Sequence, residues 1–452
     1  MKLFCKILPV LGILWTSLFF SQAVFAADTS WYNESKSEFE IGTLDELEGF
    51  RDLVNSGTNF EGKTVYLTSD IDLESVESWE GIGTPDISDT EIKNTFKGNF
   101  DGNNHIIKNM RITSPSTPFV GFFSYIEGGS VSFLRFENAN IELSSVNNYT
   151  EMGLVGTPTN YVGIACGLSM GGNFMCVQPL SGNVSVTAQS RQDGDITITD
   201  LSYCGGIAGI ALSPNDRMNG GFNFCGNNAD ITSESGACAG IVASARAQEI
   251  SYCYNKGAIT GKMAGGLVEN LSSGQLADSY NNAPVNGLLK ALKSGICANS
   301  DEDSNFYSCV DIYPNDHIVF LSGNIYDCYV CSGGTVNNYS SQVDGSFTEI
   351  DLTSMTSVEA YKFLKKFNGY FRKLAGQYYP GYSVEALYGN KTICGDLLHD
   401  GYLRKPDIAL CLKLLASGKA SEEDINICDF DNNGNFEMTD IIYMIQGDLV
   451  NY

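Results

Sequence analysis

The sequence has few of the residues that carry most enzyme chemistry. Of its 452 residues only three are histidine, His105, His317 and His399, and none of them lies in a recognisable nucleophile motif. Lys and Arg number 27 against 53 Asp and Glu, which gives a formal net charge of -26. That sign excludes nucleic acid and anionic membrane surfaces as partners. The acidity serves solubility or the binding of divalent cations.

Long hydrophobic runs are absent after the first 26 residues. A basic start at Met1, Lys2 and Lys6 precedes an apolar run over 7–20, and Val24-Phe25-Ala26 follows. This pattern indicates a secretory signal peptide, and the run is too short for a dependable membrane span. We therefore expect residues 1–26 to be removed and the mature chain, without a membrane span, to be extracellular, released or held in a cell-surface complex.

Cysteine is plentiful, but its number does not suit complete pairing. One of the 14 cysteines, Cys5, lies in the expected leader, and the remaining thirteen are an odd number. Many of them recur in one repeated context. Because Cys packs as a small apolar residue, we expect stacked buried thiols rather than a dense disulfide framework.

The centre of the chain is built from related units. CGGIAGIAL (204–212), CAGIVASA (238–245) and AGGLVENL (264–271) are each followed by a second run, FNFCGNNADI (222–231), ISYCYNKGAI (250–259) or LADSYNNAPV (276–285). Each unit has two short strand-like runs and no helical pattern, so it can bury its apolar face only against a neighbouring unit. The sequence therefore predicts a mainly β fold in which rungs stack as a solenoid.

Particular residues should form columns along such a stack. We expect Cys225, Cys253 and Cys328 to line an interior ladder. The side-chain amides of the units should form a second ladder at a turn, where they satisfy backbone groups; its members are Asn227, Asn255 and Asn281. The Gly-Gly pairs Gly205-Gly206 and Gly265-Gly266 suit corners with positive φ or a closely passing rung.

These units resemble the GLUG-motif repeat of secreted bacterial proteins, which reads roughly G-G-L-V-G and then N-x-x-I-x-N-C-Y-N-x-G-x-V. YCYNKGAI is close to that pattern, and FKGNFDGNNHIIKNMRI (96–112) is similar to the strand pair that opens many right-handed parallel β-helices. The resemblance covers about residues 36–345 and implies a right-handed parallel β-helix. It implies no activity, because this repeat class is mostly of unassigned function.

Helical segments are expected to cap the solenoid. In 41–57 a Thr43 cap with Glu46 three residues on precedes apolar residues at helical spacing, which predicts an N-terminal cap. In 357–374, Phe363, Phe367 and Leu374 share one side of a predicted helix, which is the far cap or alternatively an interaction helix. The expected domains are a solenoid with its N-terminal cap (27–345), a helical C-terminal cap and linker (346–392) and a small helical domain (393–452).

The segment CDFDNNGNFEMTD (428–440) has the spacing of a calcium loop. An EF-hand-type loop takes oxygen ligands from positions 1, 3, 5, 7, 9 and 12 and needs Gly at position 6. Gly434 stands at position 6. The ligand positions are filled by Asp429, Asp431, Asn433, Asn435 (through its carbonyl), Glu437 and Asp440. The pattern predicts bound calcium, and a solvated acidic loop is the alternative.

A second, degenerate copy lies at GDLLHDGYLRKPD (395–407). Asp396, Asp400 and Asp407 stand at positions 1, 5 and 12, whereas Leu398 and Arg404 replace the ligands at positions 3 and 9. We expect weakened calcium binding here, or retention of the turn alone.

Each loop runs into an apolar segment, 408–418 or 441–450, and ends in Asp. This tandem resembles a type I dockerin over about residues 394–450. The resemblance implies a small α-helical domain with paired EF-hand-like loops, calcium as cofactor and a cohesin module of a scaffold protein as partner. It also implies that loop positions 10 and 11 set specificity; here these are Lys405, Pro406, Met438 and Thr439. So small a domain should need its metal to fold.

No catalytic residue is assigned. His105 and Asp101 read as turn residues, and the Lys and Arg of the repeats are scattered. The first hypothesis is a dockerin-bearing module of a cellulosome-like complex whose solenoid binds a polysaccharide or cell-surface ligand. The alternative is a polysaccharide lyase or glycoside hydrolase of the same complex. Three or more Asp or Glu clustered with a Lys or Arg on one face would favour the enzyme.

Overall fold

The structure is a computed structural model. It describes residues 27–447 except for short gaps, which are 86–92, 145–158, 188–189, 194–195, 200, 216, 289–291, 320, 332–335, 339–342, 345–346, 368–370, 376, 378–380, 383–384 and 386–391. The expected leader, 1–26, lies outside the described residues. Within the described part, no helix is long and apolar enough to cross a membrane.

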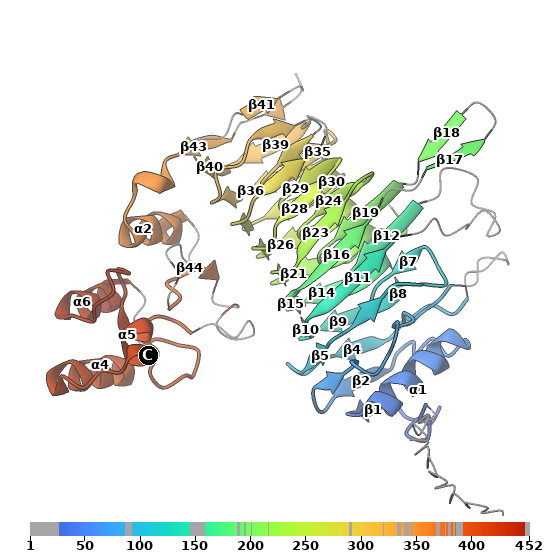
Figure 1. Ribbon diagram of the computed structural model, residues 1–452, viewed down its shortest axis with the longest axis horizontal. Helices are drawn as coiled ribbons and strands as arrows, with labels where there is room; N and C mark the ends of the chain where they lie inside the picture. Colours follow the sequence, from blue (N-terminus) through green and yellow to red (C-terminus); the bar gives the residue numbers. More distant parts are fainter. Residues whose placement is uncertain are drawn as a thin grey trace, which may run out of the picture.

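The fold is mainly β, with parallel strands stacked in successive rungs (Figure 1). The longest sheet, sheet A, takes one strand from each of eleven rungs. Its strands are β1 (Glu38–Ile41), β2 (Thr64–Leu67), β4 (Asn99–Asp101), β9 (Ser130–Ser132), β14 (Asn173–Met175), β21 (Gly221–Asn223), β26 (Glu249–Ser251), β31 (Gln275–Ala277), β36 (Asn305–Tyr307), β39 (Gly323–Tyr326) and β42 (Val343–Asp344).

Further sheets form the other sides of the stack, and each expected repeat unit runs through several of them. Sheet F contains β7 (Phe119–Val120), β12 (Thr159–Gly163), β19 (Leu201–Gly205), β24 (Ala237–Ala239), β29 (Met263–Gly265), β34 (Lys293–Ser294), β38 (His317–Val319) and β41 (Val336–Asn338). Sheet H contains β22 (Gly226–Asn227), β27 (Tyr254–Asn255), β32 (Tyr280–Asn281), β37 (Val310–Asp311), β40 (Tyr329–Cys331) and β43 (Thr348–Ile350). A hairpin of β17 (Ser190–Asp193) and β18 (Ile196–Thr199) projects from the stack (Figure 1).

Register explains how such short strands make a core. Phe222, Ile250, Leu276, Phe306 and Ile325 pair in sequence across sheet A, each with the next. All five side chains are buried inside the stack. An apolar column of this kind can form only between rungs, because one rung has no second layer of its own.

The corner between sheets A and H uses left-handed backbone at residues other than glycine. Phe224, Tyr252, Asp278, Ser308 and Asp327 have φ of 54, 55, 48, 51 and 50°. A conformation that is uncommon for such residues recurs rung after rung, so neighbouring corners hold it in place. The Gly-Gly corners have another cause: a Cβ on Gly206 would lie 2.1 Å from the Gly240 carbonyl oxygen of the next rung.

The predicted cysteine ladder is confirmed and is longer than expected. Register places Cys225, Cys253, Ser279, Cys309 and Cys328 in one column. All five are fully buried, and the amide of Cys253 donates to Ser279 Oγ at 3.0 Å. The thirteen cysteines of the described chain are buried thiols that form no disulfide with one another, as predicted.

The asparagine ladder is also confirmed. Asn227 Nδ2 donates to Asn255 Oδ1 at 2.9 Å, and Asn255 Nδ2 donates to Asn281 Oδ1 at 2.8 Å. Each amide also donates to the carbonyl two residues on, at Ala229, Gly257 or Ala283. The ladder therefore satisfies turn carbonyls inside a stack that no water reaches.

The N-terminal cap forms as predicted. Helix α1 (Leu44–Asn55) begins at Thr43 with a complete capping box to Glu46. Its Leu47, Phe50 and Val54 are fully buried in the solenoid core. In Figure 1 the helix lies at the blue, N-terminal end of the stack.

The predicted helix over 357–374 is wrong from Phe371 onward. Helix α2 (Ser357–Phe367) is followed in sequence by Asn-Gly, a pair that favours helix termination, and β44 (Phe371–Arg372) pairs antiparallel with β45 (Gly381–Tyr382). The helix packs beside sheet H: Ala360 and Leu364 share an apolar cluster with Tyr280. It therefore lies on the flank of the stack (Figure 1).

The C-terminal part is helical, with α4 (Lys405–Ser417), α5 (Glu422–Cys428) and α6 (Met438–Gly447). Their buried side chains form one cluster that also takes in residues from the preceding segment, namely Val358, Tyr361, Leu374, Ile393 and Cys394. The core of this small domain is thus completed by α2 and the chain that follows it.

Removing one amide from the buried ladder should weaken the solenoid. Asn255→Ala removes a hydrogen-bond partner from each of Asn227, Asn281 and Gly257 in a fully buried place, so we expect a loss of about 2–4 kcal/mol in the free energy of unfolding. The half-buried Asn299, bonded to Asn270 at 2.7 Å, is the matched control, and Asn299→Ala should cost less than about 1 kcal/mol. Urea denaturation of the two variants measures both; equal losses would refute the role of the ladder.

A buried carboxyl should make solenoid stability depend on pH. Burial raises the pKa of Glu269, in β30 (Val268–Ser272), to about 8. The pKa of Glu269 is higher in the folded than in the unfolded chain, so the protonated carboxyl favours the folded state. This stabilisation is complete below about pH 4.5 and is lost as the pH rises toward 8. In the parent, the free energy of unfolding should therefore fall by a few kcal/mol, at most about 5, over this pH range. Glu269→Gln should remove most of that fall. Urea midpoints at pH 5.5 and 8 under reductant test this; parallel falls in both proteins would contradict it.

Candidate metal centre

The loop between α5 and α6, loop 2 (429–440), brings three carboxylates together. Asp429, Asp431 and Asp440 each offer an oxygen, and these oxygens lie within 4.8 Å of one another. It is the one such cluster of His, Cys, Asp or Glu among the described residues. Gly434 has φ of 86°, the sharp turn that position 6 requires.

Backbone amides hold the carboxylates of loop 2 in place. Asp429 Oδ2 accepts from Gly434 N at 2.8 Å, and Asp440 Oδ2 accepts from Glu437 N at 2.7 Å. Asp440 Oδ1 also accepts from Phe430 N at 2.9 Å. Burial raises the pKa of Asp440 in spite of these bonds, so a cation would relieve a carboxylate that is poorly solvated.

The other predicted ligands lie on the rim of the same loop. Asn433, Asn435 and Glu437 are exposed, and Asn433 Oδ1 accepts from Asn435 N at 2.8 Å. Glu437 does not join the cluster of three carboxylates, whose oxygens come from Asp429, Asp431 and Asp440 alone. All six predicted ligands of loop 2 are therefore on one loop with its turn formed.

Loop 1 (396–407) has the same backbone frame. Asp396 Oδ2 accepts from Gly401 N at 2.9 Å, and Asp407 accepts from Leu398 N and Arg404 N, both at 3.0 Å. Each of these three bonds has a counterpart in loop 2, donated by Gly434 N, Asp431 N and Glu437 N. Asp396 and Asp407 are buried, and burial raises the pKa of Asp396.

The side chains of loop 1 differ at three ligand positions. Leu398, at position 3, is 49% exposed, and Asp400, at position 5, is also exposed. Arg404, at position 9, bonds Asp400 through Nη1 to Oδ2 at 2.8 Å. The three predicted ligands of loop 1, Asp396, Asp400 and Asp407, form no convergent cluster comparable to that of loop 2.

The predicted partner-binding residues lie at the start of the two loop-following helices. Lys405 and Pro406 open α4, and Met438 and Thr439 open α6; all four are exposed. On α6 Met438, Ile442 and Ile445 are 51, 43 and 48% exposed, and their spacing puts them on one face of the helix. This face is apolar and open.

Loop 2 is tied to the segment that follows α2 by a residue that the sequence did not single out. Lys373 is fully buried, and its Nζ donates to Asn432 Oδ1, to Ser357 Oγ and to the Gln377 carbonyl oxygen. Burial lowers the pKa of Lys373 to about 8, although Asp429 and Asp431 act in the opposite direction. No local pattern indicates this contact, because Asn432 is 59 residues away in sequence.

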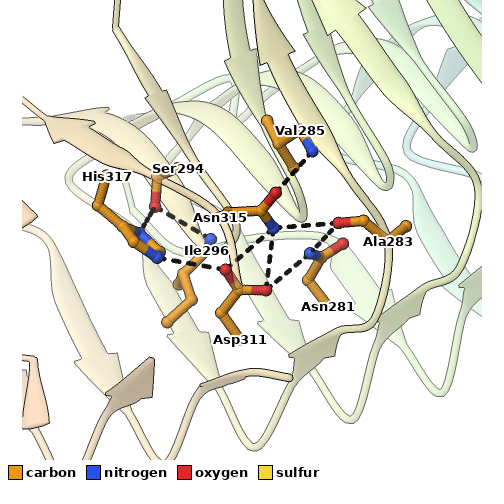
Figure 2. Close-up of polar contacts among 8 residues, drawn as sticks. All are labelled: Asn281, Ala283, Val285, Ser294, Ile296, Asp311, Asn315 and His317. Atoms are coloured by element: carbon orange, nitrogen blue, oxygen red, sulfur yellow. Dashed lines mark hydrogen bonds and ion pairs between the residues drawn. The ribbon is translucent and has the colours of Figure 1, made fainter. Parts of the chain in front are cut away.

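The last histidine of the solenoid lies in a closed polar network (Figure 2). Ser294 Oγ is 3.0 Å from His317 Nδ1, and His317 Nε2 is 3.2 Å from Asp311 Oδ2. The residue types are those of a Ser-His-Asp triad, but the two ring nitrogens are exchanged, all three side chains are fully buried, and Ser294 Oγ accepts from Ile296 N. With no access for substrate, the network is structural.

The same network ends the asparagine ladder. Asn281 Nδ2 donates to Asp311 Oδ1 at 2.8 Å, and Asn315 Nδ2 donates to the same carboxylate (Figure 2). Asp311 occupies the column of Asn227, Asn255 and Asn281. Sequence reasoning missed it, although CVDI (309–312) aligns with CYNK (253–256) and would have shown the substitution.

A charged face near the N-terminal end meets the criterion set for an enzyme. Lys108 of β5 (Ile106–Lys108) lies between Asp72 of β3 (Ile71–Asp72) and Glu137 of β10 (Arg135–Glu137). Lys108 Nζ bonds Asp70 at 2.8 Å, and His105 Nδ1 is 3.4 Å from the same carboxylate.

The two residues read as turn residues do serve turns. Asp101 Oδ1 accepts from Asn103 N at 2.8 Å, and His105 N donates to the Gly102 carbonyl oxygen.

Lys256, one of the scattered basic residues, bonds Glu385 at the flank of sheet H.

Comparisons with known proteins place the chain in no family. No protein-family model matches it. A stretch of 129 residues is 28% identical to Halomucin of Haloquadratum walsbyi (strain DSM 16790 / HBSQ001), which is 28% of this chain and 1% of Halomucin. The chain thus spans a very small part of that protein. A crystal structure of a candidate immunoglobulin A1 protease from Bacteroides ovatus aligns over 78% of this chain and 94% of that chain, with a TM-score of 0.46 and 16% identity.

Proposed function

We propose that this chain is a secreted β-solenoid protein that attaches, through a calcium-dependent C-terminal domain of dockerin type, to a cohesin module on a scaffold of cellulosome type. The observation that carries the proposal is the convergence of Asp429, Asp431 and Asp440 within 4.8 Å, on a loop with Gly434 at its turn. The solenoid would act as the binding or adhesion module for a polysaccharide or cell-surface ligand.

The donor set of loop 2 suits calcium. Carboxylate, amide and backbone oxygens stand at every ligand position, and no nitrogen or sulfur ligand competes at those positions. Bound calcium would supply charge compensation for the buried Asp429 and Asp440, fixing α5 against α6.

The partner surface follows from the same geometry. The apolar face of α6 begins at Met438, within the loop whose last ligand is Asp440. Ordering of loop 2 by the cation would therefore fix the start of the helix that presents Met438, Ile442 and Ile445. A cohesin module with a complementary apolar surface would bury these side chains.

Calcium should switch binding on. In calcium the full chain should be retained by cohesin-coated resin, and chelator should release it. Asp429→Ala removes the ligand at position 1 and should lower retention at least tenfold. Without that ligand the loop binds calcium poorly, so the ion no longer holds Asp440, at position 12, and with it the first turn of α6. Calcium-dependent heating curves of the same proteins should show that the ion no longer raises the midpoint in the variant.

The matched control is Glu423→Gln, which removes a charge from exposed α5 without touching the loop. This variant should bind as the parent does. Undiminished retention by Asp429→Ala, or retention by the parent in chelator, would refute the dockerin assignment.

The alternative is a polysaccharide-degrading enzyme, and the Asp70, Asp72, Glu137 and Lys108 face is the observation that favours it. Its chemistry is unsuited to that role. Hydrogen bonding to Asp70 raises the pKa of Lys108, which keeps it protonated, whereas a lyase base must be free to accept a proton. Asn109 lowers the pKa of Asp72, and bonds from Lys108 and Ile106 outweigh partial burial to lower that of Asp70. A glycosidase acid needs the opposite shift.

We therefore expect no release of reducing or unsaturated ends when the full chain is incubated with plant-wall polysaccharides at pH 5–9. Lys108→Ala and Asp72→Asn are the matched pair that tests the charged face. Release by the parent that both variants lose would establish the enzyme in place of the binding module.

A further inference from the structure

We infer that loop 1 holds no calcium, because Arg404 supplies an internal cation in its place, and that the C-terminal domain binds a single ion in loop 2. The inference rests on the proposed function of loop 2 and goes beyond it by assigning the second loop a different chemistry. The sequence predicted either weakened calcium binding in loop 1 or retention of the turn alone.

The first step is that the frame of loop 1 is complete as it stands. Asp396 accepts from Asp400 N and Gly401 N, and Asp407 accepts from Leu398 N and Arg404 N. Gly401 has φ of 81°, against 86° at Gly434 of loop 2. The turn is therefore formed by the same carboxylate-to-amide bonds as in loop 2, so the two loops differ in the side chains at their ligand positions and not in their backbone.

The second step concerns charge. Arg404 Nη1 lies 2.8 Å from Asp400 Oδ2, and the guanidinium carbon lies 4.5 Å from the centre of the Tyr402 ring. A guanidinium is a planar cation, and one held by both a carboxylate and an aromatic face is well fixed. A calcium ion bound to Asp400 would compete with the Arg404 guanidinium for the same carboxylate and would be repelled by its positive charge.

The third step is the count of oxygens. Calcium takes six to eight oxygen ligands. Loop 1 lacks a ligand side chain at position 3, where Leu398 is 49% exposed, and at position 9, where Arg404 stands. Loop 2 carries Asp431 and Glu437 at those positions. Loop 1 and loop 2 thus share one backbone frame. In loop 1 an internal ion pair occupies the ligand side chains, and in loop 2 the ligand side chains remain available to a metal ion.

The test is the number of ions bound by the full chain, measured with calcium chloride alone by native mass spectrometry and by calorimetric titration. The parent should bind one ion. Asp429→Ala should bind none, whereas Asp400→Asn should still bind one, with its calcium Kd within about twofold of the parent. A parent that binds two ions overturns this inference alone; a parent that binds none overturns the proposed function as well.

A gain of function tests the role of Arg404 directly. The double variant Leu398→Asp/Arg404→Glu restores the ligands of positions 3 and 9 and should bind two ions. Leu398→Asp/Arg404→Lys, which keeps a cation at position 9, is the matched control and should still bind one. Circular dichroism establishes that both are folded; a folded Asp/Glu variant that takes up no second ion overturns the role given to Arg404.

Discussion

Parallel pairing of each rung with the next is the constraint on which the structure depends. A rung of this chain has strands of only two to five residues, and it has neither a second layer nor a hairpin partner. Its backbone groups and its apolar side chains are both satisfied by the rung above and the rung below. Rungs of unequal length are tolerated, because register is fixed by the inward side chains while loops absorb the difference.

The interior polar residues follow from the same constraint. A corner buried between sheets leaves carbonyls that water cannot reach, and Asn255 satisfies one while bonding the amides on either side. A column of amides can propagate only if its last member is also satisfied. Asp311 can end the column because Asn315 and His317 lie against its carboxylate. This network lies where sheet F becomes irregular, since β38 pairs antiparallel with β34.

Sequence reasoning succeeded where local pattern and contact coincide. Repeated Cys and Asn positions predicted columns, since equal positions in stacked units must meet, and loop spacing predicted that Asp429 and Asp440 would meet. It failed where contacts join distant segments. The ion pair of Lys256 with Glu385, 129 residues apart, and the contact of Lys373 with Asn432 have no periodic signature. The end of α2 was missed for another reason, because the Asn-Gly pair that favours it is a local signal in the sequence. Arg404 was read as a missing ligand, because its pairing with Asp400 depends on the folded turn.

The two parts of the chain are not independent, because α2 belongs to both cores. Ala360 and Leu364 pack with Tyr280 on sheet H, whereas Val358 and Tyr361 pack into the helical domain. Tyr361 meets Phe430 edge-on at 5.5 Å, and Phe430 lies next to the first ligand position of loop 2. An ion that orders loop 2 would therefore also stabilise the face on which α2 rests. Because α2 is in turn held by sheet H, the orientation of the helical domain on the stack is set by packing rather than by the length of a linker.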